Sequence, residues 1–171
     1  MWSSGEGDLA VEGGGAAIEG SKDGFLETGT LVPLEPHGIR NVGDLELVAR
    51  SSQSTTVSLG SNGEIQPVRG ELVTDGDGSR RSTVLFPGNL GAVAELPGGG
   101  EQPLSVLSVR STEYSVGDEP EAHLPGAVPP GMSAIYVVDF SIAEAEALGA
   151  EHVRFDRPIA GFVENFVSIP T

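Results

Sequence analysis

The chain has 171 residues, with 25 acidic against 9 basic side chains, so its formal net charge is −16. It contains no cysteine, which excludes disulfide frameworks and thiolate metal sites. The acidity argues against DNA or RNA as a partner, and no apolar run approaches the ~20 residues that a membrane helix requires. The 25 glycines and 12 prolines instead indicate short elements joined by many turns.

Residues 1–24 hold few large apolar side chains and include three successive glycines at 13–15. A segment that buries so little surface cannot offset the entropy lost on ordering, so we expect a flexible or weakly paired arm. The apolar residues of 25–32 then predict a strand that ends at Pro33.

A hairpin is predicted next. Residues 44–50 alternate, which would place Leu45 and Leu47 on one face of a strand. The sequence Gly-Ser-Asn-Gly at 60–63 then separates strands at 55–59 and 64–68, and its Asn-Gly pair favours a tight turn between them.

A second hairpin is predicted around Asp-Gly-Asp-Gly at 75–78, between strands at 71–74 and 82–86. The two aspartates are also reminiscent of a calcium loop. The third acidic position and the distal glutamate of an EF-hand are absent, however, so we interpret the motif as a turn.

Strands at 92–96 and 104–109 flank a glycine-rich turn. In the second of them the two-residue alternation of apolar positions changes phase between Val106 and Leu107, which predicts a β-bulge. The strand would continue over 111–116 and be followed by a proline-rich loop at 118–131.

The most apolar run, at 134–140, predicts a central strand. Ser141 would cap the single helix candidate at 142–148, with Glu144 at the capping-box position and Gly149 after its end. This helix would be barely two turns long.

Two last strands are predicted at 153–156 and 161–167. Strands about ten residues apart with turns between them predict an all-β fold, an antiparallel β-sandwich or barrel-like module with at most one short helix. By composition we divide the chain into the arm, a hairpin-rich segment at 25–81 that could form a small subdomain, and a module at 82–171 that we expect to be truncated at its C-terminus.

Apolar and aromatic residues at strand spacings predict the core. They are Val84, Phe86, Val106, Val109, Tyr114, Ile135, Val137, Phe155, Phe162 and Phe166. Core packing also explains the aromatic residues at strand spacings better than a ligand-binding stripe does; they are Tyr114, Tyr136, Phe140, Phe155, Phe162 and Phe166.

No catalytic residue, cofactor-binding residue or metal ligand is predicted. His37, His123 and His152 are scattered without metal-ligand spacing, so we interpret them as exposed loop residues. No nucleophile motif is present, and the glycines at 13–15 lack the strand and the Lys-Ser/Thr pair of a phosphate loop. Carboxylate pairs for glycoside hydrolysis exist among 25 acids, but the sequence selects none. We therefore expect a protein that is not an enzyme and holds no cofactor.

A set of short motifs follows in order along the second half of the chain: STVLFP at 82–87, LSVLSV at 104–109, VRSTEYSVG at 109–117, LPGAVPP at 124–130, YVVDFS at 136–141, VRFDRP at 153–158 and VENF at 163–166. With them, residues 82–171 resemble the N-terminal, pre-repeat β-rich region of large bacterial RHS/YD-repeat proteins. The resemblance implies a secreted or surface-exposed protein whose repeats form a β-shell around a toxin or effector. It brings no catalytic residues to this chain.

The expected function is that of a non-catalytic structural module, a scaffold or plug for the repeat shell, and its expected partner is the remainder of its own parent chain. The expected location is extracellular or at the cell surface. The first residues carry no secretory signal and the last follow an apolar run, so we expect a fragment of a longer protein. The alternatives are a surface adhesion module that binds a glycan or a protein, with or without calcium, and an acid-pair hydrolase.

Overall fold

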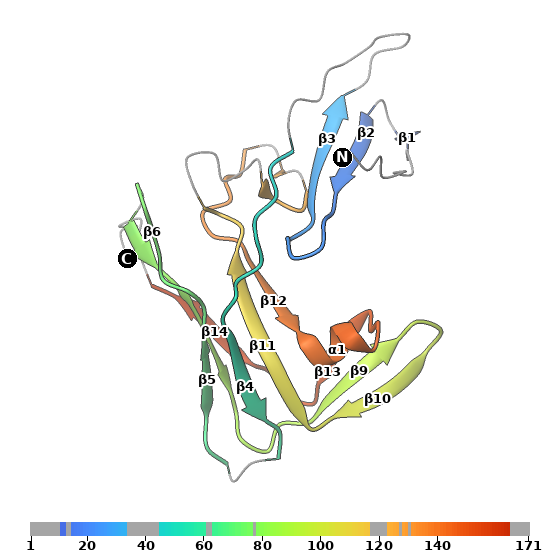
Figure 1. Ribbon diagram of the computed structural model, residues 1–171, viewed down its shortest axis with the longest axis vertical. Helices are drawn as coiled ribbons and strands as arrows, with labels where there is room; N and C mark the ends of the chain where they lie inside the picture. Colours follow the sequence, from blue (N-terminus) through green and yellow to red (C-terminus); the bar gives the residue numbers. More distant parts are fainter. Residues whose placement is uncertain are drawn as a thin grey trace. The chain divides into compact units, whose positions relative to one another are not determined.

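The structure is a computed structural model that describes residues 11–12, 15–33, 45–60, 63–76, 78–116, 123–126, 128–129 and 131–164. These residues form antiparallel sheets and one short helix, so the predicted all-β fold is confirmed (Figure 1). The chain divides into two compact units. Unit 1 comprises Met1–Arg50 and Tyr114–Val137, and unit 2 comprises Ser51–Glu113 and Val138–Thr171.

Unit 1 contains a sheet of three strands in the order β1 (Val11–Glu12), β2 (Gly15–Gly20) and β3 (Thr28–Pro33). Strand β2 lies within the predicted arm and pairs along its whole length with β3. A small apolar cluster forms around buried Leu26 and Tyr114. The Tyr114 hydroxyl donates to the carbonyl oxygen of Glu27 at 3.0 Å, which satisfies its polar end.

Unit 2 holds the other strands and the helix. They are β4 (Ser54–Ser58), β5 (Gln66–Arg69), β6 (Val73–Asp75), β7 (Gly78–Arg80), β8 (Ser82–Phe86), β9 (Ala92–Leu96), β10 (Gly100–Leu104), β11 (Val106–Glu113), β12 (Val138–Ile142), α1 (Ala143–Ala147), β13 (His152–Phe155) and β14 (Ala160–Val163). The sheet orders are β12-β11-β4, β14-β8-β5 and β10-β9-β13, and β6 pairs with β7 in a separate hairpin. The pairing of β5 with β8 joins residues on both sides of the division that composition placed after residue 81.

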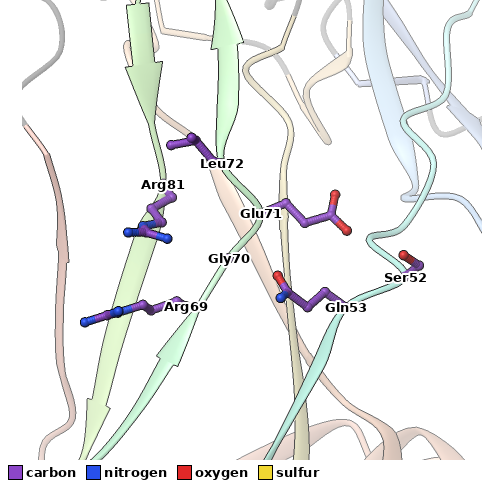
Figure 2. Close-up of a pocket in the computed structure, with 7 residues that line it drawn as sticks. All are labelled: Ser52, Gln53, Arg69, Gly70, Glu71, Leu72 and Arg81. Atoms are coloured by element: carbon purple, nitrogen blue, oxygen red, sulfur yellow. The ribbon is translucent and has the colours of Figure 1, made fainter.

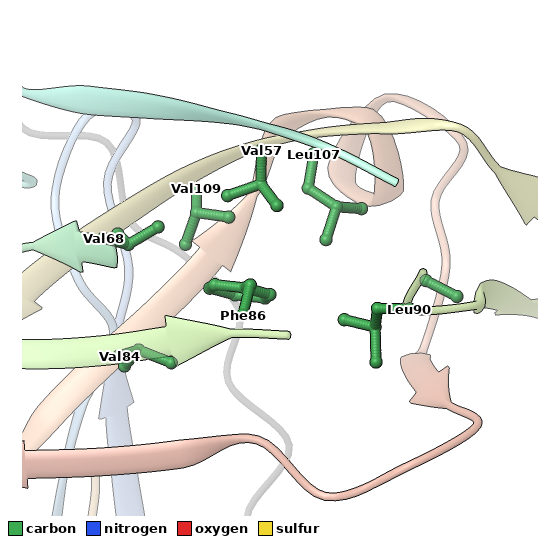
Figure 3. Close-up of a cluster of buried hydrophobic side chains, with 8 residues drawn as sticks. Val57, Val68, Val84, Phe86, Leu90, Leu107 and Val109 are labelled. Atoms are coloured by element: carbon green, nitrogen blue, oxygen red, sulfur yellow. The ribbon is translucent and has the colours of Figure 1, made fainter. Parts of the chain in front are cut away.

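The first two of these sheets face each other across one apolar core. Figure 3 shows Val57 of β4 and Val109 of β11 pointing toward Val84 and Phe86 of β8. The Phe86 ring meets Phe155 of β13 edge-on, with ring centroids 6.1 Å apart. Since both inner faces contribute buried side chains at every second position, unit 2 has the sandwich arrangement.

The predicted hairpin over 55–68 is wrong. Strands β4 and β5 follow each other in the chain but lie in different sheets, β4 beside β11 and β5 beside β8. The two strands are connected through the side chain of Gln66 in β5. Its amide group donates to the Ser58 carbonyl of β4 and accepts from the Ser58 N–H, both at 2.9 Å. The Asn-Gly signal could not reveal this, since it favours a turn without specifying the partner of each strand.

The second hairpin exists in a shorter form. Strand β6 pairs with β7, and β8, which was expected as the return strand, pairs with β5 and β14. The expected bulge in β11 is also wrong, because its register with β4 is continuous. The change of phase arises at Ser105, where the chain leaves β10 in one sheet and enters β11 in another.

The expected central strand at 134–140 is wrong as well. Strand β12 begins at Val138, and among the described residues it pairs with β11 alone, so it lies at an edge. The short helix is present, but Ile142 rather than Ser141 is its N-cap, without a side-chain cap. The Glu144 carboxylate instead accepts from the N–H and the hydroxyl of Ser108, each at 2.7 Å, and so fastens α1 to β11.

The predicted core is partly right. Val84, Phe86, Val109 and Tyr114 are buried, and Val137 and Phe155 pack half-buried against the two clusters. Val106, Ile135 and Phe162 are exposed, by 38, 50 and 55 %. Phe166 lies outside the described residues. The alternation identified the strands, but it could not tell a face covered within this chain from one left open.

Candidate functional site

The interior of the sandwich changes from apolar to polar toward one end. Along β11 the buried positions of one face are Leu107, Val109, Ser111 and Glu113. Along β8 and the end of β7 they are Phe86, Val84, Ser82 and Arg80. Since side chains on a strand alternate between faces, each series lines the inner side of its strand. The two polar ends meet.

The serines form the first polar layer. The Ser82 and Ser111 hydroxyls are buried and 2.6 Å apart, one donating to the other. Gly70 lies against them, and a Cβ atom there would be 2.7 Å from Ser82 Oγ. Only a glycine therefore lets the backbone after β5 approach this pair so closely.

Arg80 forms the second polar layer. Its side chain is 1 % exposed, and it donates through Nε to Glu113 at 2.6 Å. Its two terminal nitrogens donate to both Asp75 oxygens at 2.7 and 2.8 Å, the bidentate geometry that suits guanidinium and carboxylate. The bond to Asp75 raises the pKa of Arg80, burial lowers it, and Glu113 raises it further, so the net pKa is well above its usual value. The guanidinium stays charged and joins the β6–β7 hairpin to β11.

An open groove of about 640 Å³ lies on the outside of this end. Figure 2 shows its lining, which is Ser52, Gln53, Gly70, Glu71 and Leu72 together with Arg69 and Arg81. Gly70 thus touches the groove on one side and the buried serines on the other.

Two of the residues that line this groove are arginines. Arg69 is opposite Thr83 in the pairing of β5 with β8, so Arg81, two residues before Thr83, is its diagonal neighbour on the same outer face. In Figure 2 both guanidinium groups lie on one side, away from the Glu71 carboxylate. Glu71 accepts instead from the Ser51 hydroxyl at 2.8 Å. Within the described part of the chain, neither Arg69 nor Arg81 pairs with a carboxylate.

The aspartates and histidines considered as metal ligands in the sequence analysis do not line this groove. In the Asp-Gly-Asp-Gly motif, both carboxylate oxygens of Asp75 accept hydrogen bonds from Arg80. Asp77 lies outside the described residues. His123 is buried, contrary to expectation, with its Nε2 2.9 Å from a Glu46 oxygen. His152 is exposed but lies in strand β13, and His37 is outside the described residues.

Sequence reasoning missed Arg69, Arg80 and Arg81 because it used the basic residues only in the net charge of the whole chain. Three of the nine basic residues fall within residues 69–81, and that cluster is the signal that could have found them. Which of the three is buried depends on the pairing of the strands, which the sequence did not reveal.

In the described ranges, no helix is long and apolar enough to cross a membrane, and no three His, Asp or Glu side chains gather as a metal site. No family model matches the sequence, and neither a curated protein nor a solved structure was found to match it.

Proposed function

We propose that this chain is a non-catalytic structural module of a large exported protein of the RHS/YD-repeat type, and that neighbouring parts of the parent chain cover its open strand faces. The observation that carries the proposal is the exposure of residues that are patterned as core. Phe162 of β14 and Val106 of β11 occupy regular strand positions, yet they are 55 and 38 % exposed.

The exposed residues lie on ordered strands, where the backbone already has a fixed shape. Phe140 of the edge strand β12 adds a third large side chain, 43 % exposed. Large apolar side chains held on such surfaces favour burial against another surface, because water is released when they are covered. In a module of a larger chain, that surface is supplied by the same polypeptide.

The family part of the proposal is tested by reading the coding frame beyond Thr171. Repeated Tyr-Asp motifs in the same frame would support an RHS/YD-repeat parent. A frame without such repeats would contradict it.

The packing part is tested by hydrogen exchange on this chain and on the longer gene product. We expect the amides of β14 and β12 to exchange more slowly in the longer product, because covering an edge strand protects its open N–H groups. Strand β8 is the internal control, since it is paired on both sides already. Equal exchange of β14 and β12 in both proteins would contradict the packing role.

A further inference from the structure

The groove beside Gly70 holds two positive charges that the described part of the chain leaves without a carboxylate. Arg80, Arg154 and Arg157 of the same unit each hold one or two carboxylates within 3.3 Å. Arg69 and Arg81 do not, although the protein carries 25 acidic residues. Like charges on neighbouring strands repel each other, and an anion bound to the two guanidinium groups would relieve this repulsion.

The surroundings of the pair extend it into a surface of mixed chemistry. Phe162 is opposite Thr83 in the pairing of β14 with β8, so Arg69, Thr83 and Phe162 form one row across the outer face of the sheet. Thr83 is buried in this row although it faces outward, as expected for a small residue between two large neighbours. The row therefore offers a cation at one end and an exposed aromatic ring at the other.

The register of the two arginines matches the spacing of side chains on an extended peptide. Diagonal neighbours on paired strands are about 7–8 Å apart. Residues i and i+2 of an extended chain, whose side chains point the same way, are about 7 Å apart. An extended peptide with acidic residues at alternate positions would thus present one carboxylate to each guanidinium, and each such pair can form two hydrogen bonds.

We propose that this groove binds an extended polypeptide segment with acidic side chains at alternate positions and an apolar side chain over Phe162. Arg69 and Arg81 hold the carboxylates. Ser52 and Gln53 line the groove on the side where Glu71 lies, away from the two guanidinium groups (Figure 2). This inference rests on the proposed packing role, since it names the chemistry of one neighbour that the module meets.

The test uses two synthetic peptides of equal composition and charge, titrated into the full chain by calorimetry. One has two glutamates at alternate positions and a leucine, and the other has the two glutamates side by side. We expect the alternating peptide to bind more tightly, because adjacent side chains of an extended chain point in opposite directions. Equal affinity of the two peptides, or binding of neither, would overturn the proposal.

Single substitutions in the groove test whether the peptide binds there. Arg69→Gln and Arg81→Gln should each weaken binding of the alternating peptide about tenfold or more, the loss expected for a hydrogen bond between charged groups. Arg154→Gln is the matched control, an exposed arginine of the same unit that already holds Glu95 and Glu101, and it should leave binding unchanged. Unchanged affinity in both groove variants would place the peptide elsewhere and overturn the assignment.

A polyuronate, which carries carboxylates on a sugar chain, is the competing ligand. If it binds through Arg69 and Arg81 and the alternating peptide does not, the groove is a glycan site and the inference is wrong.

The peptide proposal and the packing proposal can fail separately. Absence of peptide binding together with protection of β14 in the longer product overturns this inference alone, and peptide binding without that protection overturns the packing role.

Discussion

The two ends of the core in unit 2 both involve β8 and β11 but hold together differently. At one end Val84 and Phe86 of β8 pack with Leu107 and Val109 of β11 as an apolar cluster. At the other end Ser82 of β8 bonds to Ser111 of β11, and Arg80 at the end of β7 bonds to Glu113 of β11. A strand can therefore change its packing chemistry from apolar to polar within two residues, provided that the facing strand changes in step.

The difference between the ends lies in what a single substitution leaves behind. In the apolar end a truncated side chain leaves a cavity, and the cost follows its volume. In the polar end a missing partner leaves a buried charge or hydroxyl without a bond, and the cost follows that unsatisfied group. Removing both partners of a polar pair should therefore cost less than the sum of the two single changes.

The largest effect is expected from Arg80→Ala. It would leave Glu113 buried without its cation and Asp75 without its bidentate partner, so we expect a loss of about 3–5 kcal/mol in the free energy of unfolding. Urea unfolding followed by circular dichroism measures it. Phe86→Ala, from the apolar end, serves as the reference with a cost of about 3–5 kcal/mol as well. A loss under about 1 kcal/mol for Arg80→Ala would mean that the charges are not buried as described.

A smaller effect is expected in the serine layer. Ser82→Ala or Ser111→Ala should each cost about 1–3 kcal/mol, because the remaining buried hydroxyl loses its partner. The double variant should cost less than the sum. Full additivity in the same unfolding experiment would show that the two hydroxyls do not meet.

Gly70→Ala tests how closely the backbone approaches the Ser82–Ser111 pair. Its new methyl group would overlap Ser82 Oγ, so it should destabilise the wild type and be better tolerated in the Ser82→Ala background. Thermal melting of the four proteins measures this coupling. An equal cost in both backgrounds would place the clash elsewhere.

A pH-dependent effect is expected where α1 meets β11. Burial raises the pKa of Glu144, but the bonds from the Ser108 N–H and hydroxyl lower it more, so the net pKa is below its ordinary value of 4.5. A lowered pKa contributes stability above pH 4.5, and this contribution is lost as the pH falls through the folded-state value. Ser108→Ala should therefore cost about 1 kcal/mol at neutral pH and less in acid. The same cost at neutral and acid pH would exclude a charged Glu144 as the partner.

The smallest effect is expected at Phe162. Because the ring is 55 % exposed, Phe162→Ala should change the free energy of unfolding of this chain by no more than about 0.5 kcal/mol. Phe155→Ala is the matched control, since that ring packs against Phe86 and should cost clearly more. A loss of about 3 kcal/mol at Phe162 would mean that the ring is buried within the chain and would remove the main support for the packing role.

The fold class and most strand positions were predictable, because alternation of apolar residues and turn motifs act locally. Strand pairing was not, and β4 and β5 show why: a turn between two strands does not decide whether they share a sheet. The exposure of Phe162 could not be predicted either, since a strand face that stays exposed has the same apolar pattern as one that is buried within the chain. No site residue was predicted, because Arg69 and Arg81 become neighbours only through the pairing of β5 with β8.

The β6–β7 hairpin is joined to β11 through the buried pair of Arg80 and Glu113. A double-mutant cycle with Arg80→Met and Glu113→Leu measures this contact. Ser79→Ala with Glu113→Leu is the control pair, since Ser79 is exposed and bonds to Thr74 instead. We expect the double variant to be more stable than the sum of the single losses predicts, by more than about 1 kcal/mol. Additivity within about 0.5 kcal/mol would contradict the claim, because groups that do not touch contribute independently.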